Sequence, residues 1–303
     1  MQATEVAVLP ERAYNLRDRP AGQRILHTLL RFCRAKPLGA VSAVIILLMV
    51  VGAVFAPIVA PQDYRRVNAR EKLQGPSAQH WLGTDQLGRD MYSRIVYGAR
   101  VSLVVGFVAT FLGVGLGAAI GLFAGYFGGK TDMLLMRFSD AVQAFPGLIL
   151  ALAIVAALGP GLRNAFIAVS ITLLARPARV VRSSVLAAKA TAWVEAAHTV
   201  GASHPRIMFR HILPNVFAPI MVLASLVLGI AILIEASLSF LGLGVLPPTP
   251  AWGSMLNQAG ALYFETHPYM AVVPAVAISL AVFSFNLFGD ALRDVLDPRL
   301  RGS

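Results

Sequence analysis

The chain has 303 residues, of which 57% are hydrophobic and only 14% are charged, and its mean hydropathy is +0.69. Soluble domains carry about 25% charged residues, so this composition excludes an ordinary soluble domain and a disordered chain. A single cysteine, Cys33, excludes a disulfide framework and a cysteine-based metal site. The net charge of +11 comes from basic residues between long apolar runs, which indicates contact with a membrane surface and not with nucleic acid.

The N-terminal segment, residues 1–37, is basic and precedes the first apolar run. It is not typical of a cleavable signal peptide, because the apolar run is long and begins only at position 38. Within Arg24–Arg34 the apolar side chains share one helical face. This pattern predicts either a helix lying in the cytoplasmic membrane interface or a short helix packed on another subunit.

Five charge-free runs are long enough to cross a bilayer, which takes about 20 residues. They cover residues 38–60, 101–127, 141–162, 212–234 and 268–289. A sixth run, residues 164–175, crosses only if its helix continues past Arg176, Arg179 and Arg182, whose side chains would then extend toward the lipid headgroups.

The distribution of positive charge decides whether this sixth run crosses. With six crossings, 18 basic residues lie on the side of the N-terminus and 8 on the other side, whereas five crossings give 9 and 17. Positive charge collects on the cytoplasmic side, so we predict an all-α membrane protein of six transmembrane helices with both termini cytoplasmic. Its parts are a cytoplasmic segment 1–37, a membrane domain 38–289 with external loops 61–100 and 242–267 and a cytoplasmic segment 183–211, and a tail 290–303.

The second apolar run carries four glycines spaced four residues apart: Gly113, Gly117, Gly121 and Gly125. On a helix they form one smooth face, which predicts close packing against another helix. The segment 124–131 that follows resembles a phosphate-binding loop, but it has alanine at the first glycine position and follows a membrane helix instead of a strand. We therefore expect no nucleotide site in this chain.

The external segment 80–103 predicts an amphipathic helix that leads into the second span. Thr84 or Asp85 can cap its start, and the four-residue spacings of Asp85 to Arg89 and of Asp90 to Arg94 allow ion pairs along it.

The cytoplasmic segment between the fourth and fifth spans predicts two short helices. Residues 193–200 form the first, ended by Gly201, and Ser203 could cap the second, with Pro205 in its first turn. Pro214 marks the entry to the fifth span. From the residues alone, this segment is either a docking surface or a structural loop.

Glu235 interrupts the apolar fifth span, and ionisable groups at membrane depth usually face the protein interior. Two roles are open: Glu235 lines a solute pathway near a peptide's terminal amine, or it is a structural carboxylate that is bonded to a neighbouring helix or lies near the outer surface. The sequence shows neither a nucleophile paired with a base nor a metal-binding spacing of histidines. We therefore expect no catalytic residues and no metal site.

Several segments resemble known transport proteins. Glu195-Ala-Ala, followed by Gly201 and by His211-Ile-Leu-Pro-Asn, is similar to the cytoplasmic signature of bacterial binding-protein-dependent ABC importer permeases. The general signature prefers isoleucine where this chain has His211, and the histidine form resembles the peptide-importer branch. Four further segments resemble the C-type subunit of dipeptide, oligopeptide and nickel importers: residues 80–103, 238–244, 250–253 and 294–299.

The resemblance implies a type I ABC importer permease in the bacterial inner membrane. Its partners would be a second homologous permease, two ATP-binding subunits, an extracytoplasmic solute-binding protein and the lipid bilayer. ATP and Mg²⁺ would bind the ATPase subunits, and this chain would hold no cofactor. The cargo implied is a dipeptide or short oligopeptide, with nickel complexes and other small solutes as the alternative.

The resemblance also carries functional roles onto individual residues. The ATPase-coupling residues would be Glu195, Ala196, Ala197, Gly201, His211 and Pro214. Contacts with the binding protein, or the outer gate, would involve Asp85, Arg89, Asp90 and Trp252. A secondary transporter is the competing class, and it predicts paired intramembrane charges or inverted repeats. Glu235 stands alone in its span and no repeat is evident, which disfavours that class.

Overall fold

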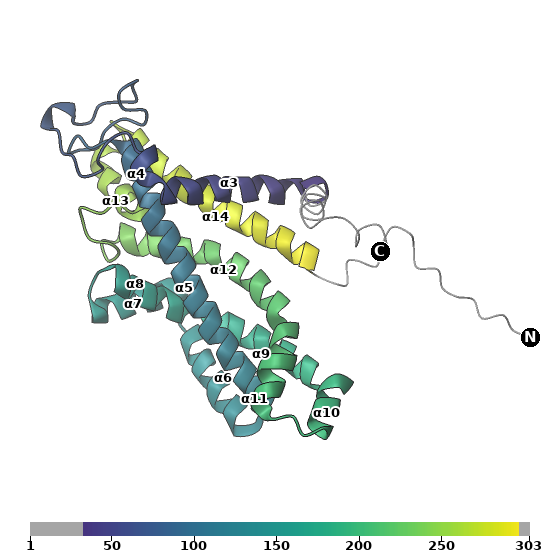
Figure 1. Ribbon diagram of the computed structural model, residues 1–303. Coiled ribbons are helices and arrows are strands. Elements are labelled where there is room, and N and C mark those ends of the chain that lie inside the picture. The colour runs from purple at the N-terminus through teal and green to yellow at the C-terminus, as the bar shows by residue number, and fades with distance from the viewer. Residues whose placement is uncertain (1–32, 297–303) are drawn as a thin grey trace, which may run out of the picture.

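A computed structural model describes residues 33–296 and is mostly helical, with no β-strand among these residues (Figure 1). The predicted interfacial helix at 24–34 lies almost wholly outside the described residues, as does the tail beyond 296. The main helices are α3 (Pro37–Val54), α4 (Ala56–Val59), α5 (Met91–Phe127), α6 (Gly129–Gln143), α7 (Gly147–Leu158), α8 (Leu162–Leu173), α9 (Ala175–Lys189), α10 (Ala192–Thr199), α12 (Leu213–Phe240), α13 (Trp252–Tyr263) and α14 (Tyr269–Leu296).

Within the described residues, four helices are long and apolar enough to cross a membrane, and two bent helix pairs bring the number to six if each pair is one crossing. This agrees with the predicted six spans. Helix α5 begins at Met91, ten residues before the apolar run, so the end of the expected external loop is helical. At 1.5 Å per residue its 37 residues measure about 55 Å, and it extends through the centre of the molecule (Figure 1).

The glycine face of α5 packs directly on the backbone of α8 and α9. A Cβ atom added at Gly113 would lie 2.7 Å from the carbonyl oxygen of Ser170, and one at Gly125 would lie 2.9 Å from that of Arg182. Added Cβ atoms at Gly117 and Gly121 would be closer still to backbone oxygens of α9 and its N-cap. The prediction of close packing on this face is confirmed.

The third span is not the single straight helix expected over residues 141–162. Helices α6 and α7 meet at a bend of 91° around Phe145 and Pro146. Proline has no N–H and disfavours a helical conformation in the residue before it, so the helix ends at Gln143 and restarts at Gly147.

The fourth span consists of α8 and α9, which are bent by 43° at Leu174. The helix does continue past the arginines, as the charge distribution requires. Two of these arginines form ion pairs with a neighbouring helix, and their reach toward the lipid headgroups stays a prediction. The Arg179 guanidinium lies 2.7 Å from the Asp140 carboxylate, and Arg182 forms two hydrogen bonds of 2.5 Å with Asp132, so both arginines pair with acidic residues of α6.

The first and last spans lie together. Helices α3 and α14 pack side by side (Figure 1), and the Lys36 ammonium forms an ion pair with Asp294. The beginning of the first span and the end of the last span are therefore at the same end of the molecule, as an even number of crossings requires.

Candidate functional site

One end of α5 carries the segment between the fourth and fifth spans, which we call the coupling segment (residues 190–212). Helix α10 is followed by Gly201 with φ of +78°, a left-handed conformation that glycine adopts freely. The first predicted short helix is thus present, at the opposite end of α5 from the 60–90 loop (Figure 1).

The second short helix is not separate, and this corrects the prediction. Ser203 stands at the N-cap, but its side chain makes no capping hydrogen bond. The helix that starts at His204 continues through a π-helical stretch, Ile207–Ile212, into α12 and forms one 37-residue span to Phe240. The π-helical turn lies just before Pro214, which has no N–H to donate within the helix. In this turn the N–H of Leu213 bonds to the carbonyl of Met208, five residues earlier, where an α-helix would bond four residues earlier.

Helix α10 has a packed face and an open face. Val194 and Ala197 are buried against Ile207 and Ile212. Glu195 and Ala196 are exposed, and the apolar side chain of Val200 is 82% exposed. Of the coupling residues that the resemblance suggested, Ala197 therefore points inward. The remaining predicted residues are Gly201 and Pro214, which are exposed, and His211, which is half-buried.

A polar cluster joins the coupling segment to the end of α5. The Tyr126 hydroxyl and His204 Nδ1 are 2.7 Å apart, and Lys189 Nζ donates to the Tyr126 carbonyl oxygen at 2.7 Å. The rings of His198 and His204 lie 6.0 Å apart, centroid to centroid. Sequence analysis missed Tyr126 and His204, since no local spacing connects residues 78 positions apart.

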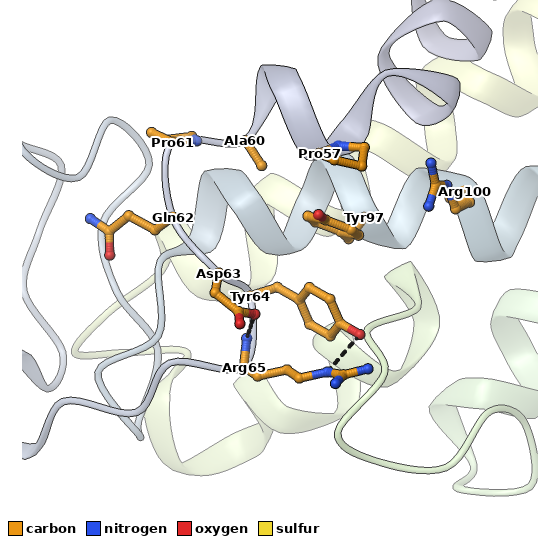
Figure 2. Close-up of a pocket in the computed structure, with 9 residues that line it drawn as sticks. All are labelled: Pro57, Ala60, Pro61, Gln62, Asp63, Tyr64, Arg65, Tyr97 and Arg100. Atoms are coloured by element: carbon orange, nitrogen blue, oxygen red, sulfur yellow. Dashed lines mark hydrogen bonds between the residues drawn. The ribbon is translucent and has the colours of Figure 1, made fainter.

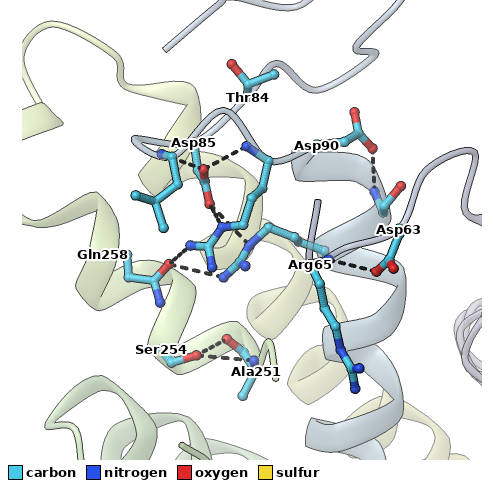
Figure 3. Close-up of polar contacts among 12 residues, drawn as sticks. Asp63, Arg65, Thr84, Asp85, Asp90, Ala251, Ser254 and Gln258 are labelled. Atoms are coloured by element: carbon cyan, nitrogen blue, oxygen red, sulfur yellow. Dashed lines mark hydrogen bonds and ion pairs between the residues drawn. The ribbon is translucent and has the colours of Figure 1, made fainter. Parts of the chain in front are cut away.

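The opposite end of α5 holds a buried charged network (Figure 3). Asp85 Oδ2 accepts a hydrogen bond of 2.6 Å from Arg89 and lies 3.5 Å from Arg94 Nε. Both guanidinium groups also donate to Gln258 Oε1, at 3.0 and 3.1 Å. Gln258 belongs to α13, so the network ties the loop before α5 to the segment between α12 and α14.

The external helix predicted within residues 80–103 begins later than expected, at Met91 instead of after Thr84 or Asp85, and one of its two expected ion pairs is absent. Residues 85–90 form a loop with left-handed Gly88, and Asp90 caps α5 by accepting from the Ser93 N–H at 2.8 Å. The ion pair between Asp85 and Arg89 is present, but Asp90 bonds to His80 Nδ1 at 2.9 Å instead of Arg94. The loop is shaped by tertiary contacts and not by helical spacing.

The four residues expected at the outer gate are all buried: Asp85, Arg89, Asp90 and Trp252. The Trp252 indole N–H donates to the Ile95 carbonyl at 3.1 Å and thereby holds α13 against α5. These side chains position the external loops. Their direct contact with another protein stays a prediction.

Glu235 is 1% exposed and lies where α12 faces α5 and the start of α13. Its Oε1 accepts a 2.7 Å hydrogen bond from Ser239, one turn along the same helix. Ser102 of α5 lies beside it, and the Ser102 hydroxyl also accepts from the backbone N–H of Trp252 at 3.4 Å. The interior placement expected for this residue is present, and a role on a solute pathway stays a prediction.

These features define the class of protein: a multi-pass helical membrane protein with a short exposed helix, α10, at one end and two loops joined by hydrogen bonds at the other. Residues 117–302 match the family model described as the binding-protein-dependent transport system inner membrane component. Residues 27–76 match the N-terminal TM domain of oligopeptide transport permease C. The chain belongs to the binding-protein-dependent transport system inner membrane component family.

Relatives cover nearly the whole chain. It is 47% identical over 277 residues to a glutathione transport system permease protein, GsiD, of Shigella flexneri serotype 5b (strain 8401), with 91% of each chain covered. It is 46% identical over 264 residues to a dipeptide transport system permease protein, DppC, of Alkalihalophilus pseudofirmus, and the match covers 87% of this chain and 86% of that protein.

A solved structure shares the fold. A chain of the MetNI methionine ABC transporter, in an inward-facing conformation, superposes with a TM-score of 0.57 at 20% identity, covering 68% of this chain and 98% of that one. The chain is thus a multi-pass inner-membrane permease subunit of an ABC importer, and it works with ATPase and binding-protein subunits. The family resemblance found in the sequence is confirmed.

Proposed function

We propose that this chain is one of two homologous permease subunits of an importer that moves dipeptides or short oligopeptides into the cytoplasm. Two separate ATPase subunits would bind Mg²⁺ and ATP and supply the energy. The cargo rests on the relatives, whose names specify glutathione and dipeptide transport. Glutathione is itself a tripeptide, so both names indicate the same chemical class. No feature of the described residues favours nickel complexes.

The observation that carries this proposal is the open face of α10. Glu195 and Ala196 are exposed on it, beside the exposed apolar side chains of Trp193 and Val200, while Val194 anchors the helix from behind. Clustered apolar side chains on a surface outside the bilayer usually mark a protein interface. An ATPase cleft that receives this helix would cover them.

The helix is connected so that movement applied to it would reach the membrane. Its C-terminal end is joined by the short turn at residues 200–203 to the 37-residue helix that starts at His204, and the Tyr126–His204 hydrogen bond couples that start to α5. Approach of the ATPases would tilt these two long helices together. ATP binding would thereby shift the permease from an inward-open to an outward-open population.

Charge reversal at Glu195 tests the proposal. The Glu195→Arg variant, reconstituted into proteoliposomes with its partner subunits, should lose ATP-dependent uptake of a labelled dipeptide and release the ATPase subunits during purification. The control is Glu265→Arg, the same reversal at an exposed site beyond α13, which should keep the ATPases bound. Uptake by the permease without any ATPase would overturn the proposal and favour a secondary transporter.

A further inference from the structure

A polar pocket lies beside the point where the first span ends and α5 begins (Figure 2). It has a volume of about 550 Å³ and is lined by the end of α4, the segment after it and one face of α5. Its functional groups are two tyrosines and two arginines: Tyr64 and Arg65 from the loop, and Tyr97 and Arg100 from α5. The transport mechanism proposed above uses none of them.

The aromatic rings hold the two arginines in place. The rings of Tyr64 and Tyr97 contact each other with centroids 4.5 Å apart. The Arg65 guanidinium lies 5.1 Å from the Tyr64 ring centre and donates from Nε to the Tyr64 hydroxyl at 2.9 Å, and the Arg100 guanidinium lies 5.9 Å from the Tyr97 ring centre. Stacking on a ring covers only the face of a guanidinium, so those of its N–H groups that have no other partner can bind an anion.

The positive charge of the pocket is only partly neutralised by the residues that line it, because Asp63 is one carboxylate against two arginines. Arg100 donates to the carbonyl oxygens of Ala53 and Val54, at 3.0 and 2.9 Å, which fixes it to the end of α3 without a counter-charge. Asp63 accepts from the backbone N–H of Arg65 at 2.9 Å. Neither guanidinium forms an ion pair with a carboxylate among residues 33–296.

The ends of the apolar runs place the pocket at the depth expected for the lipid headgroups. The apolar run of the first span stops at residue 60 and that of α5 starts at residue 101, so Arg100 stands at the edge of the apolar region of both helices. Beside it, Ile58 is 80% exposed, and the outer face of α3 presents Leu47 and Leu48. Tyrosine is enriched at this depth, and arginine binds phosphate oxygens through two parallel hydrogen bonds.

We propose that this pocket binds the phosphate of a phospholipid headgroup, with the acyl chains lying along the exposed apolar face of α3. The two arginines and Asp63 together give the pocket a net positive charge, so an anionic phosphatidylglycerol should bind more tightly than zwitterionic phosphatidylethanolamine. Free phosphate shares the headgroup chemistry, but it gains nothing from the apolar face of α3.

Native mass spectrometry of the assembled importer tests this by counting retained lipids during titration with phosphatidylglycerol. The double variant Arg65→Gln/Arg100→Gln should bind one lipid about 25-fold more weakly, from roughly fivefold per arginine. The matched control is Arg66→Gln/Arg70→Gln, which removes the same charge from the same loop outside the pocket and should bind as the wild type does. Arg65→Gln alone leaves the contacts of Arg100 at the end of α3 intact and should show the smaller effect.

Three results would overturn the inference. The first is equal phosphatidylglycerol binding by the wild type and the double variant. The second is displacement of the lipid by millimolar inorganic phosphate, which would make the pocket a free-anion site. The third is loss of binding-protein docking in the double variant with unchanged lipid binding, which would assign the arginines to a protein contact.

Discussion

Replacing Gly121 by alanine should separate α5 from α9. An added Cβ would lie 2.8 Å from the Arg182 backbone nitrogen and 3.0 Å from Val181 Cβ, and nearer still to the Ala178 carbonyl oxygen. Ordinary contact begins at 3.4 Å, so the helices must part by at least 0.6 Å. A gap of this size loses about a quarter of the dispersion energy of each contact it opens, and overpacking of this kind costs about 1–3 kcal/mol.

Thermal unfolding in detergent measures the effect, with a fall in Tm of roughly 2–4 °C per kcal/mol. The control is Gly115→Ala on the same helix, where a Cβ would meet nothing within 4 Å of it. Alanine favours a helix over glycine by about 1 kcal/mol, so the control should be neutral or more stable. Equal Tm values for the two variants would refute the close-packing argument.

Asp85→Asn should leave the guanidinium of Arg94, which is 1% exposed, without its carboxylate partner. Because this leaves an unpaired buried charge, the variant should lose about 3–5 kcal/mol of folding stability. The loss should appear as a lower Tm and as less folded protein in size-exclusion chromatography. The control Asp63→Asn changes an exposed carboxylate of the same loop and should matter little. Glu235→Gln keeps an oxygen that can accept from Ser239, so uptake and assembly should be unchanged.

The predictions for Asp85→Asn and Glu235→Gln can each be contradicted by one result. If Asp85→Asn and Asp63→Asn have the same Tm, the buried network does not stabilise the loops. If Glu235→Gln assembles normally but transports less peptide, the carboxylate lies on the solute pathway and acts through its charge.

Much of the architecture could be predicted because it depends on local composition and charge. The apolar runs located the crossings, and the arginines after residue 175 decided that the fourth span continues. The spacing of Gly113 to Gly125 predicted a packed face because four residues are about one helical turn. The short helix before Gly201 was likewise predicted from the sequence, and the family resemblance suggested that it couples the permease to an ATPase subunit.

The charged network could not be predicted, because its partners are distant in sequence. Arg89 and Arg94 share Gln258, which lies 169 and 164 positions away. From helical spacing, Asp90 was expected to pair with Arg94, but in the folded protein Asp90 bonds to His80. The pairing of Arg182 with Asp132 was missed for the same reason.

By itself, the sequence determined that this is a six-span membrane protein of a particular transport family, because hydropathy, charge distribution and signature segments are properties of the chain. Only the tertiary structure decided that the third span bends at Pro146, that Ala197 points inward, and that Arg100 lies at the end of α3 beside two tyrosines. Those outcomes depend on which surfaces meet when the helices pack, and residues far apart in the chain decide that together.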